Sequence, residues 1–209
     1  CFGATKNGAL GAEAVILFQD IFTPIPAMGV DLDFAPGPVI AEPIREASQI
    51  EALRVPDPRE SVPFVFEIIR RLRESLGARD IPLLGFGGAP FTLAAYMIQG
   101  SGSKDFSVLK AMLQQRPDEV EALLEKLTLL TIDYLKAQIE AGAEAVQLFD
   151  TWAGLLDHEA YARWVHPYHQ RSAAALADEP APLILYVQNG SHVVDLIANA
   201  GADVISLDW

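Results

Sequence analysis

Short apolar runs alternate with longer amphipathic stretches along most of the chain. Five runs have the length and composition of buried strands, and they span residues 15–18, 81–86, 146–149, 183–187 and 204–207. Their nearly continuous apolar character is typical of parallel strands that are covered on both faces. The stretches between them are long enough for helices, so the pattern predicts an α/β chain with a parallel sheet.

Apolar residues recur at helical spacing between these runs. They predict helices over residues 61–76, 90–97, 105–113, 117–142, 157–177 and 192–200. Asp105 and Ser191 are placed to cap two of them, and Pro167 predicts a kink or a division into two pieces. Segment 22–58 is rich in proline, so we expect it to be a loop or an excursion packed over one end of the sheet.

A repeated motif precedes three of the predicted strands. It reads Gly-Ala-acid and occupies residues 11–13, 142–144 and 201–203. The glycine is suited to end a helix, and the residues after it begin a strand. An aspartate follows each of these three strands, and the three aspartates are Asp20, Asp150 and Asp208. Because parallel strands end at one edge of a sheet, the pattern predicts carboxylates at a shared face.

The alternation is compatible with two architectures. One is a (β/α)8 TIM-type barrel, of which about five βα units are visible, and the other is an open doubly wound sheet. Periodicity alone does not separate them. Gly85-Phe86-Gly87 lacks the third glycine of a dinucleotide-binding fingerprint, so a Rossmann site is not supported. We expect a single domain over residues 1–209.

Composition narrows the class of protein. The chain has 209 residues, of which 51% are hydrophobic, enough for one sizeable core. Its apolar runs fall short of the roughly 18 residues of a membrane helix, so we expect no membrane span. The single cysteine, Cys1, leaves no internal disulfide and no multi-cysteine metal site. This cysteine usage suits a reducing compartment, and we expect a cytoplasmic protein.

The balance of acidic and basic residues indicates which kinds of partner the protein is able to bind. Lysine and arginine number 15 against 28 acidic residues, which gives a formal net charge of −13. A strongly acidic chain is a poor partner for nucleic acid, so we expect none. The sequence begins without methionine and stops at Trp209 directly after an apolar run. We therefore expect it to be the central portion of a longer protein.

Segment 82–100 carries the most specific pattern. An apolar strand ends in Gly85-Phe86-Gly87-Gly88, and Pro90 then suits the first turn of a helix that contains Tyr96. This order places Tyr96 near the carboxyl end of the strand. Without other information, a tight turn with a core tyrosine is the ordinary interpretation.

Two stretches resemble signatures of the uroporphyrinogen decarboxylase family. One runs from Gly85 to Met97 and continues in Gly-Ser-Lys-Asp-Phe at 102–106. The other runs from Phe18 to Gly29 and contains Asp20. The resemblance extends over 11–209 and favours the barrel over the doubly wound sheet.

The resemblance implies a reaction and a site. The family removes CO2 from the four acetate side chains of uroporphyrinogen III to give coproporphyrinogen III in heme biosynthesis, as a homodimer and without a cofactor. The residue that matches Asp20 lies under the middle of the tetrapyrrole, where it accepts hydrogen bonds from pyrrole N–H groups and takes part in catalysis. Phe86, Tyr96 and Thr151 match substrate-binding positions, although the family usually has serine at the position of Thr151.

The chain departs from the family pattern at both ends. The family carries an arginine-rich loop before the first of these strands, and residues 1–9 contain no arginine. Its substrate-binding histidine lies beyond the last residue of this chain. Because the substrate bears eight carboxylates, those arginines matter for binding. We expect the chain to hold the floor of the site without its main anion-binding loop.

Other interpretations stay open. One is a methyltransferase of the same superfamily, cobamide- or zinc-dependent, and another is a tetrapyrrole-binding module without catalysis. His166 and His169 have a spacing that suits metal ligands, but structural histidines fit the sequence better because no third ligand is evident. The loop 100–104 lacks Walker spacing, although Lys104 is able to face an anionic substrate. Asp20 itself also suits a loop cap, and we interpret Trp152 as a packing residue.

Overall fold

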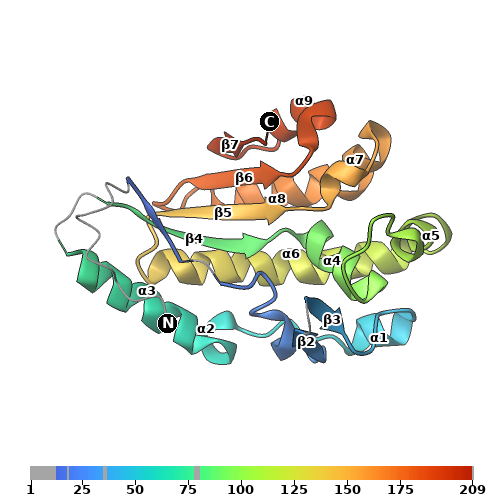
Figure 1. The fold of residues 1–209 in the computed structure, drawn as a ribbon, viewed down its shortest axis with the longest axis horizontal. Coiled ribbons are helices and arrows are strands. Elements are labelled where there is room, and N and C mark those ends of the chain that lie inside the picture. Colours follow the sequence, from blue (N-terminus) through green and yellow to red (C-terminus); the bar gives the residue numbers. More distant parts are fainter. Residues whose placement is uncertain (1–12, 18, 35–36, 78–80, 209) are drawn as a thin grey trace.

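A five-stranded parallel sheet forms the centre of the computed structural model, which describes residues 13–17, 19–34, 37–77 and 81–208 (Figure 1). Its strands, in spatial order, are β1 (Val15–Ile16), β4 (Leu83–Gly88), β5 (Ala145–Asp150), β6 (Leu183–Val187) and β7 (Val204–Ser206). All four pairings are parallel. The predicted parallel sheet is confirmed, and Phe18 at the end of the first predicted run lies outside the described residues.

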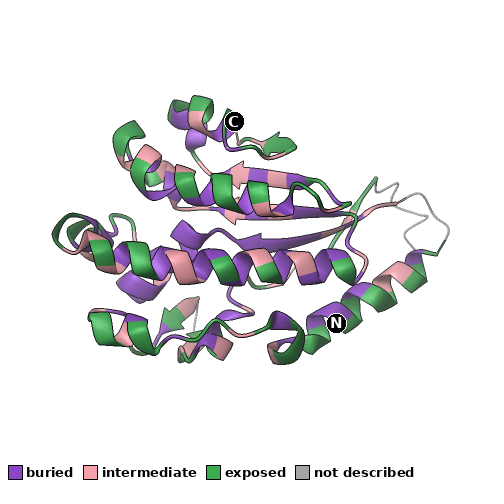
Figure 2. Cartoon of the chain, turned by 180° about the vertical axis from the view of Figure 1, so that it is seen from behind, coloured by how far each residue is buried: buried purple, intermediate pink, exposed green. Residues whose placement is uncertain are grey.

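Spatial order equals chain order in this sheet, which distinguishes the two candidate architectures. A doubly wound sheet reverses its strand order at a switch point and has helices on both faces. Here each strand pairs with the next one along the chain, and α6 (Pro117–Glu140) and α8 (His166–Leu176) cover the same face. Figure 2 shows these two helices in front of the sheet from the opposite side. The fold is that of a TIM-type barrel, of which the structure describes five strands.

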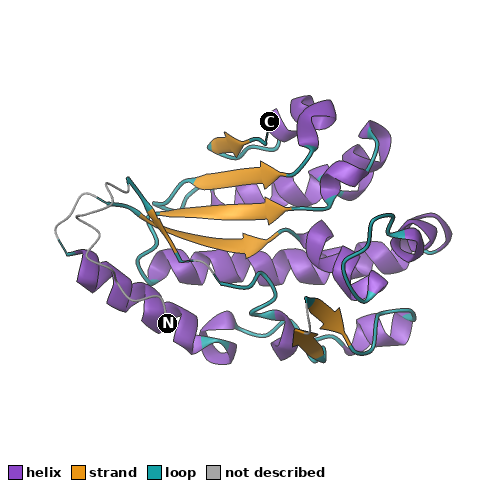
Figure 3. Ribbon diagram, viewed as in Figure 1, coloured by secondary structure: helices purple, strands orange, loops and turns teal. Residues whose placement is uncertain are grey.

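The helices follow the predicted pattern with shifted ends (Figure 3). Their bounds are α2 (Pro58–Ser61), α3 (Pro63–Leu76), α4 (Pro90–Gln99), α5 (Ser107–Gln115), α7 (His158–Trp164) and α9 (Val194–Ala198). Proline stands in the first turn of α2, α3, α4, α6 and α8. A backbone N–H at this position has no acceptor within the helix, so its absence in proline costs no hydrogen bond. None of the helices in the described residues is both long and apolar enough to cross a membrane.

Three predicted helices begin differently from the sequence interpretation. The helix expected from residue 61 starts at Pro63, because α2 ends at Ser61 and Val62 is not helical. Phe106 occupies the N-cap of α5, and the Asp105 carboxylate, one residue earlier, accepts the Ser107 N–H at 3.4 Å. Ser191 caps no helix, because a 3-10 turn over Gly190–Val193 precedes α9. The division at Pro167 is confirmed, since α7 and α8 are separate helices.

Segment 22–58 contains more regular structure than the expected loop. It holds a 3-10 helix (Ile25–Met28), a two-stranded antiparallel sheet of β2 (Leu32–Phe34) and β3 (Pro38–Ile40), and α1 (Ala47–Ala52). The Ile44 N–H donates to the carbonyl of Met97 in α4 at 2.9 Å. Lys126 of α6 donates to three carbonyls of the segment, among them Ile50 and Leu53 at 2.7 Å each. These bonds fix the excursion beside the carboxyl ends of the strands (Figure 1).

The acidic residue of the Gly-Ala-acid repeat ties neighbouring strands together. The Glu144 carboxylate accepts the backbone N–H of Leu83 at 3.0 Å, where β4 begins. The Asp203 carboxylate accepts the N–H of Leu183 at 2.8 Å, where β6 begins. Gly142, the glycine of the second copy, has a φ of 114° and follows the end of α6, as the motif predicts. The glycine of the repeat therefore ends the helix, and its acidic residue helps to fix the register between the strand that follows it and the preceding strand of the sheet.

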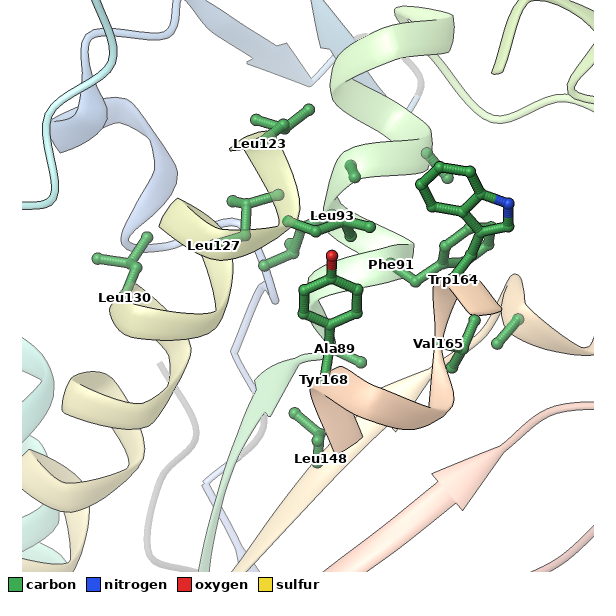
Figure 4. Close-up of a cluster of buried hydrophobic side chains, with 14 of the residues drawn as sticks. Ala89, Phe91, Leu93, Leu123, Leu127, Leu130, Leu148, Trp164, Val165 and Tyr168 are labelled. Carbon is green, nitrogen blue, oxygen red and sulfur yellow. The ribbon is translucent and has the colours of Figure 1, made fainter. Parts of the chain in front are cut away.

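The core lies between the outer face of the sheet and its helices. Leu123, Leu127 and Leu130 of α6 are fully buried. Figure 4 shows Leu127 beside Leu93 of α4 and Tyr168 of α8 in one cluster. Removal of this apolar surface from water provides the main driving force for docking the helices on the sheet.

Gln138 of α6 fixes β4 from the outer face. Its buried side-chain amide accepts the Phe86 N–H at 3.0 Å and donates to the Phe86 carbonyl at 2.9 Å. A Cβ at Gly85 would approach the Gln138 side-chain oxygen to 2.4 Å and would push this amide out of its hydrogen bonds with Phe86. The glycines of β4 thus admit a polar side chain that holds the strand in place.

The two faces of the sheet differ in burial, contrary to the expectation that both are covered. Val146, Leu148 and Leu185 point to the helices and are at most 1% exposed. Phe149 and Tyr186, which alternate with them, are only half-buried. In the described part of the chain, the inner face of β5 and β6 is therefore less buried than the face that the helices cover.

The edges of the sheet lead to a prediction about the isolated 209-residue chain. Within the described residues β7 pairs only with β6, and Val204 and Leu207 are 46% and 53% exposed. Because unpaired apolar edges promote association, we expect this chain to self-associate in light scattering after size-exclusion chromatography. A Val204→Lys/Leu207→Lys double variant should shift it toward monomer.

Leu129→Lys is the matched control, because Leu129 is 49% exposed on α6 and lies away from this edge. It should leave the association unchanged. A wild-type chain that is monomeric and melts in one sharp transition would contradict the expectation.

Candidate functional site

A pocket of about 520 Å³ lies at the carboxyl ends of β1, β4 and β5. Its lining consists of Gln19, Asp20, Ile21, Phe22, Pro38, Phe86, Tyr96, Phe149 and Thr151. The four predicted site residues, which span 131 positions of sequence between Asp20 and Thr151, therefore meet in one cavity. This is the face at which barrel proteins hold their small-molecule sites.

Asp20 reaches the pocket from the turn that follows β1. Its Oδ1 atom accepts the backbone N–H of Phe22 at 2.8 Å, and its carbonyl accepts the Thr23 hydroxyl at 2.7 Å. The side chain is exposed. Asp20 thus does cap a turn, as the ordinary interpretation requires, and it also presents its carboxylate to the cavity. The turn holds this carboxylate in place before any ligand arrives.

Tyr96 projects from α4 into an aromatic cluster beside the pocket. Its ring makes an edge contact with Phe22, with centroids 4.9 Å apart, and another with Trp152 at 5.8 Å. Burial raises the pKa of the Tyr96 hydroxyl, the Trp152 indole N–H lowers it, and the Asp20 carboxylate raises it again. The hydroxyl is consequently a neutral donor at physiological pH.

Phe86 and Phe149 form an apolar wall of the pocket. Their ring centroids are 5.4 Å apart, and Phe149 in turn contacts Tyr186 of β6 at 5.6 Å. The sequence interpretation missed Phe149, although a signal was present. Side chains alternate along a strand, so Phe149 shares its face with Thr151, which was recognised.

The charge of the pocket comes from one group. Among its lining residues Asp20 is the only carboxylate, and none is lysine or arginine. A carboxylate at the edge of an aromatic wall, beside two hydroxyls, suits a flat heterocycle with N–H donors. The N–H groups are able to pair with Asp20, while the ring faces contact Phe86 and Phe149.

Asp150, the residue before Thr151, points away from this pocket. It is fully buried on the helix side, where Oδ1 accepts the Thr92 hydroxyl at 2.6 Å and Oδ2 lies 2.8 Å from Nε2 of His169. Nδ1 of His169 lies 3.2 Å from the Tyr161 hydroxyl. The structure therefore places His169 in a buried polar chain. No three His, Cys, Asp or Glu side chains converge as metal ligands in the described ranges.

The strand order and the pocket at the carboxyl ends define the class of protein, an α/β barrel with a small-molecule site. The model of the family "Uroporphyrinogen decarboxylase (URO-D)" matches residues 7–209, and the chain belongs to this family. The chain is 49% identical over 200 residues to uroporphyrinogen decarboxylase of Geobacter sp. (strain M21). It is 50% identical over 201 residues to that of Syntrophotalea carbinolica. These matches cover 96% of this chain and 59% and 58% of the two relatives.

Proposed function

We propose that the protein carrying this chain decarboxylates the acetate side chains of uroporphyrinogen III and releases coproporphyrinogen III. The observation that carries the proposal is the position of Asp20, the one charged group of a pocket that also contains Phe86, Tyr96 and Thr151. The names of the relatives support the same reaction. The chain spans about three fifths of the length of these relatives, so the reaction is assigned to the natural protein that contains it.

The chemistry needs an electron sink and a stabilising anion. Protonation of a pyrrole carbon beside the nitrogen makes the ring cationic, and the ring then accepts the electron pair left when the acetate carbon loses CO2. A second proton converts the resulting exocyclic methylene group to methyl, and the ring carbon then gives up the first proton, which restores the neutral pyrrole. A carboxylate held beside the pyrrole N–H groups stabilises the positive charge that develops on the ring. The hydrogen bond from the Phe22 N–H holds the Asp20 carboxylate at the pocket, where it is able to take this role.

The hydroxyls of Tyr96 and Thr151 have a positioning role in this proposal. Both line the pocket with Asp20, and a neutral hydroxyl donates well to an acetate or propionate carboxylate. The substrate's remaining carboxylates need cations, which the described lining does not supply. We place that role on arginines of the natural protein outside the described pocket.

A turnover assay tests the function directly. The natural-length protein is incubated with uroporphyrinogen III under reducing, anaerobic conditions, and the products are oxidised and separated by the number of carboxylates. Loss of four carboxylates supports the proposal. Binding without loss of CO2 would indicate a tetrapyrrole-binding module instead and would overturn the enzymatic function.

We also propose that the natural protein works in the cytoplasm as a homodimer.

Tyr96→Phe and Thr151→Ala should each cause a modest loss of activity. Each variant removes one neutral hydrogen bond, which is worth about 0.5–1.5 kcal/mol, so kcat/KM should fall about two- to tenfold. Tyr168→Phe is the control for loss of a tyrosine hydroxyl, because Tyr168 of α8 is buried in the hydrophobic cluster of Figure 4 and does not line the pocket. Steady-state kinetics on the natural-length protein check the expectation, and losses no larger than that of the control would contradict it.

A further inference from the structure

Trp152 has a buried polar atom that its packing role does not explain. The indole Nε1 is inaccessible to solvent and has no hydrogen-bond partner among the described residues. A buried donor without a partner costs free energy, so native structures rarely keep one unless it has a functional role. Trp152 does not line the pocket, although it directly follows Thr151, which does.

The neighbours of Trp152 show where this donor acts. Its ring lies against Tyr96 with centroids 5.8 Å apart and against Phe106 at 4.8 Å. The interplanar angle to Tyr96 is 62°, an edge arrangement. This edge contact agrees with the lowering effect of the indole N–H on the pKa of the Tyr96 hydroxyl. Tyr96 both lines the pocket and contacts Trp152, so it connects the indole to the cavity.

The backbone of Trp152 is fixed from the buried side of the sheet. Its N–H donates to the Thr92 hydroxyl oxygen at 3.0 Å, and that hydroxyl donates to Asp150 at 2.6 Å. Asp150 is held in turn by His169. This chain of hydrogen bonds joins α4, β5 and α8, so the turn that carries Trp152 has little freedom to move.

We propose that Trp152 is a positioning residue that orients the Tyr96 hydroxyl toward the substrate. An indole N–H donates and never accepts, so the Tyr96 oxygen must be the acceptor. The Tyr96 proton then points away from Trp152 and into the pocket, where it donates to a carboxylate of the tetrapyrrole. Hydrogen bonds of this kind are often long in an empty site and shorten when the ligand binds. The inference rests on the proposed function for the identity of that ligand.

A spectroscopic test addresses the contact without any need for turnover. The indole N–H signals of the natural-length, ¹⁵N-labelled protein are assigned from Trp152→Phe and Trp164→Phe variants. Tyr96→Phe keeps the ring and removes only the oxygen, so the Trp152 signal should move upfield while the Trp164 signal stays. A Trp152 signal that does not move would overturn the proposal, whatever reaction the protein performs.

A double-mutant cycle tests the consequence for catalysis. Trp152→Phe should lower kcat/KM for uroporphyrinogen III about two- to tenfold, the effect of one neutral hydrogen bond. If Trp152 acts through Tyr96, the same change in a Tyr96→Phe background should cost less than about twofold. Trp164→Phe, the same substitution in the core outside the pocket, should leave kcat/KM unchanged.

The outcomes separate this inference from the proposed function. Equal losses from Trp152→Phe in both backgrounds would overturn the positioning role while leaving the decarboxylase intact. Absence of decarboxylation in the wild-type protein would overturn the proposed function, and the indole signal would then decide the Trp152–Tyr96 contact alone.

Discussion

Asp20→Asn should lower kcat of the natural-length protein about a hundred- to a thousandfold and change KM little. Asp20 is proposed to stabilise positive charge that is fully developed only after the pyrrole ring is protonated. Removal of one such preorganised interaction costs about 3–4 kcal/mol of transition-state stabilisation. The ground-state substrate carries no such charge, so its binding loses much less.

The turn at Asp20 makes asparagine an informative replacement. Oδ1 of Asp20 accepts the Phe22 N–H at 2.8 Å, and the amide oxygen of asparagine is able to accept it in the same way. Asp20→Asn should therefore keep the melting temperature, whereas Asp20→Ala should lower it as well as kcat. If capping the turn were the sole role, Asn would be active and Ala would lose only stability.

Asp33→Asn is the matched control for this experiment. Its Oδ1 also accepts the backbone N–H of a neighbouring residue, that of Phe34 at 2.7 Å, and it is exposed on β2 outside the pocket. We expect its kcat and melting temperature to equal those of the wild type. Both quantities are measured on the same samples, and a near-normal kcat for Asp20→Asn would refute the catalytic role of Asp20.

The sequence pattern predicted the strands well because their apolar runs report burial directly. The predicted run 183–187 has the same bounds as β6. Each of the other four runs overlaps its strand and differs from it by at most two residues at either end. Element ends were harder to predict. Proline at residue 63 and a left-handed φ of 48° at Phe106 set two helix starts through local backbone geometry. Periodicity of apolar residues carries no information about either.

The three strand-end aspartates show how much the site depended on resemblance. Asp20, Asp150 and Asp208 occupy the same place in the pattern, yet only Asp20 lines the pocket. Asp150 shares its strand face with Val146 and Leu148, so it points to the helices and pairs with His169. Alternation along the strand would have predicted this orientation. The partners of Asp150 come from α4 and α8, and such long-range contacts leave no local signal in the sequence.

The buried contact between Asp150 and His169 leads to the largest stability effect that we expect. His169→Leu should lower the free energy of unfolding by about 3–5 kcal/mol, because it leaves the Asp150 carboxyl group short of a partner in a dry environment. The side chains of His169 and Asp150 are 1% and 0% exposed, and they lie 2.8 Å apart. For a domain of this size the loss corresponds to a fall in Tm of roughly 6–20 °C.

His158→Leu is the matched control, because His158 lies 3.0 Å from the Asp195 carboxylate with both side chains more than half exposed. Water replaces the lost partner there, so Tm should not change measurably. Adding Asp150→Asn to His169→Leu should recover part of the lost stability, since an unpaired amide is cheaper to bury than a carboxylate. Thermal melts of the three variants and the wild type test these expectations. Equal melting temperatures for the two histidine variants would contradict a stabilising role of the buried contact.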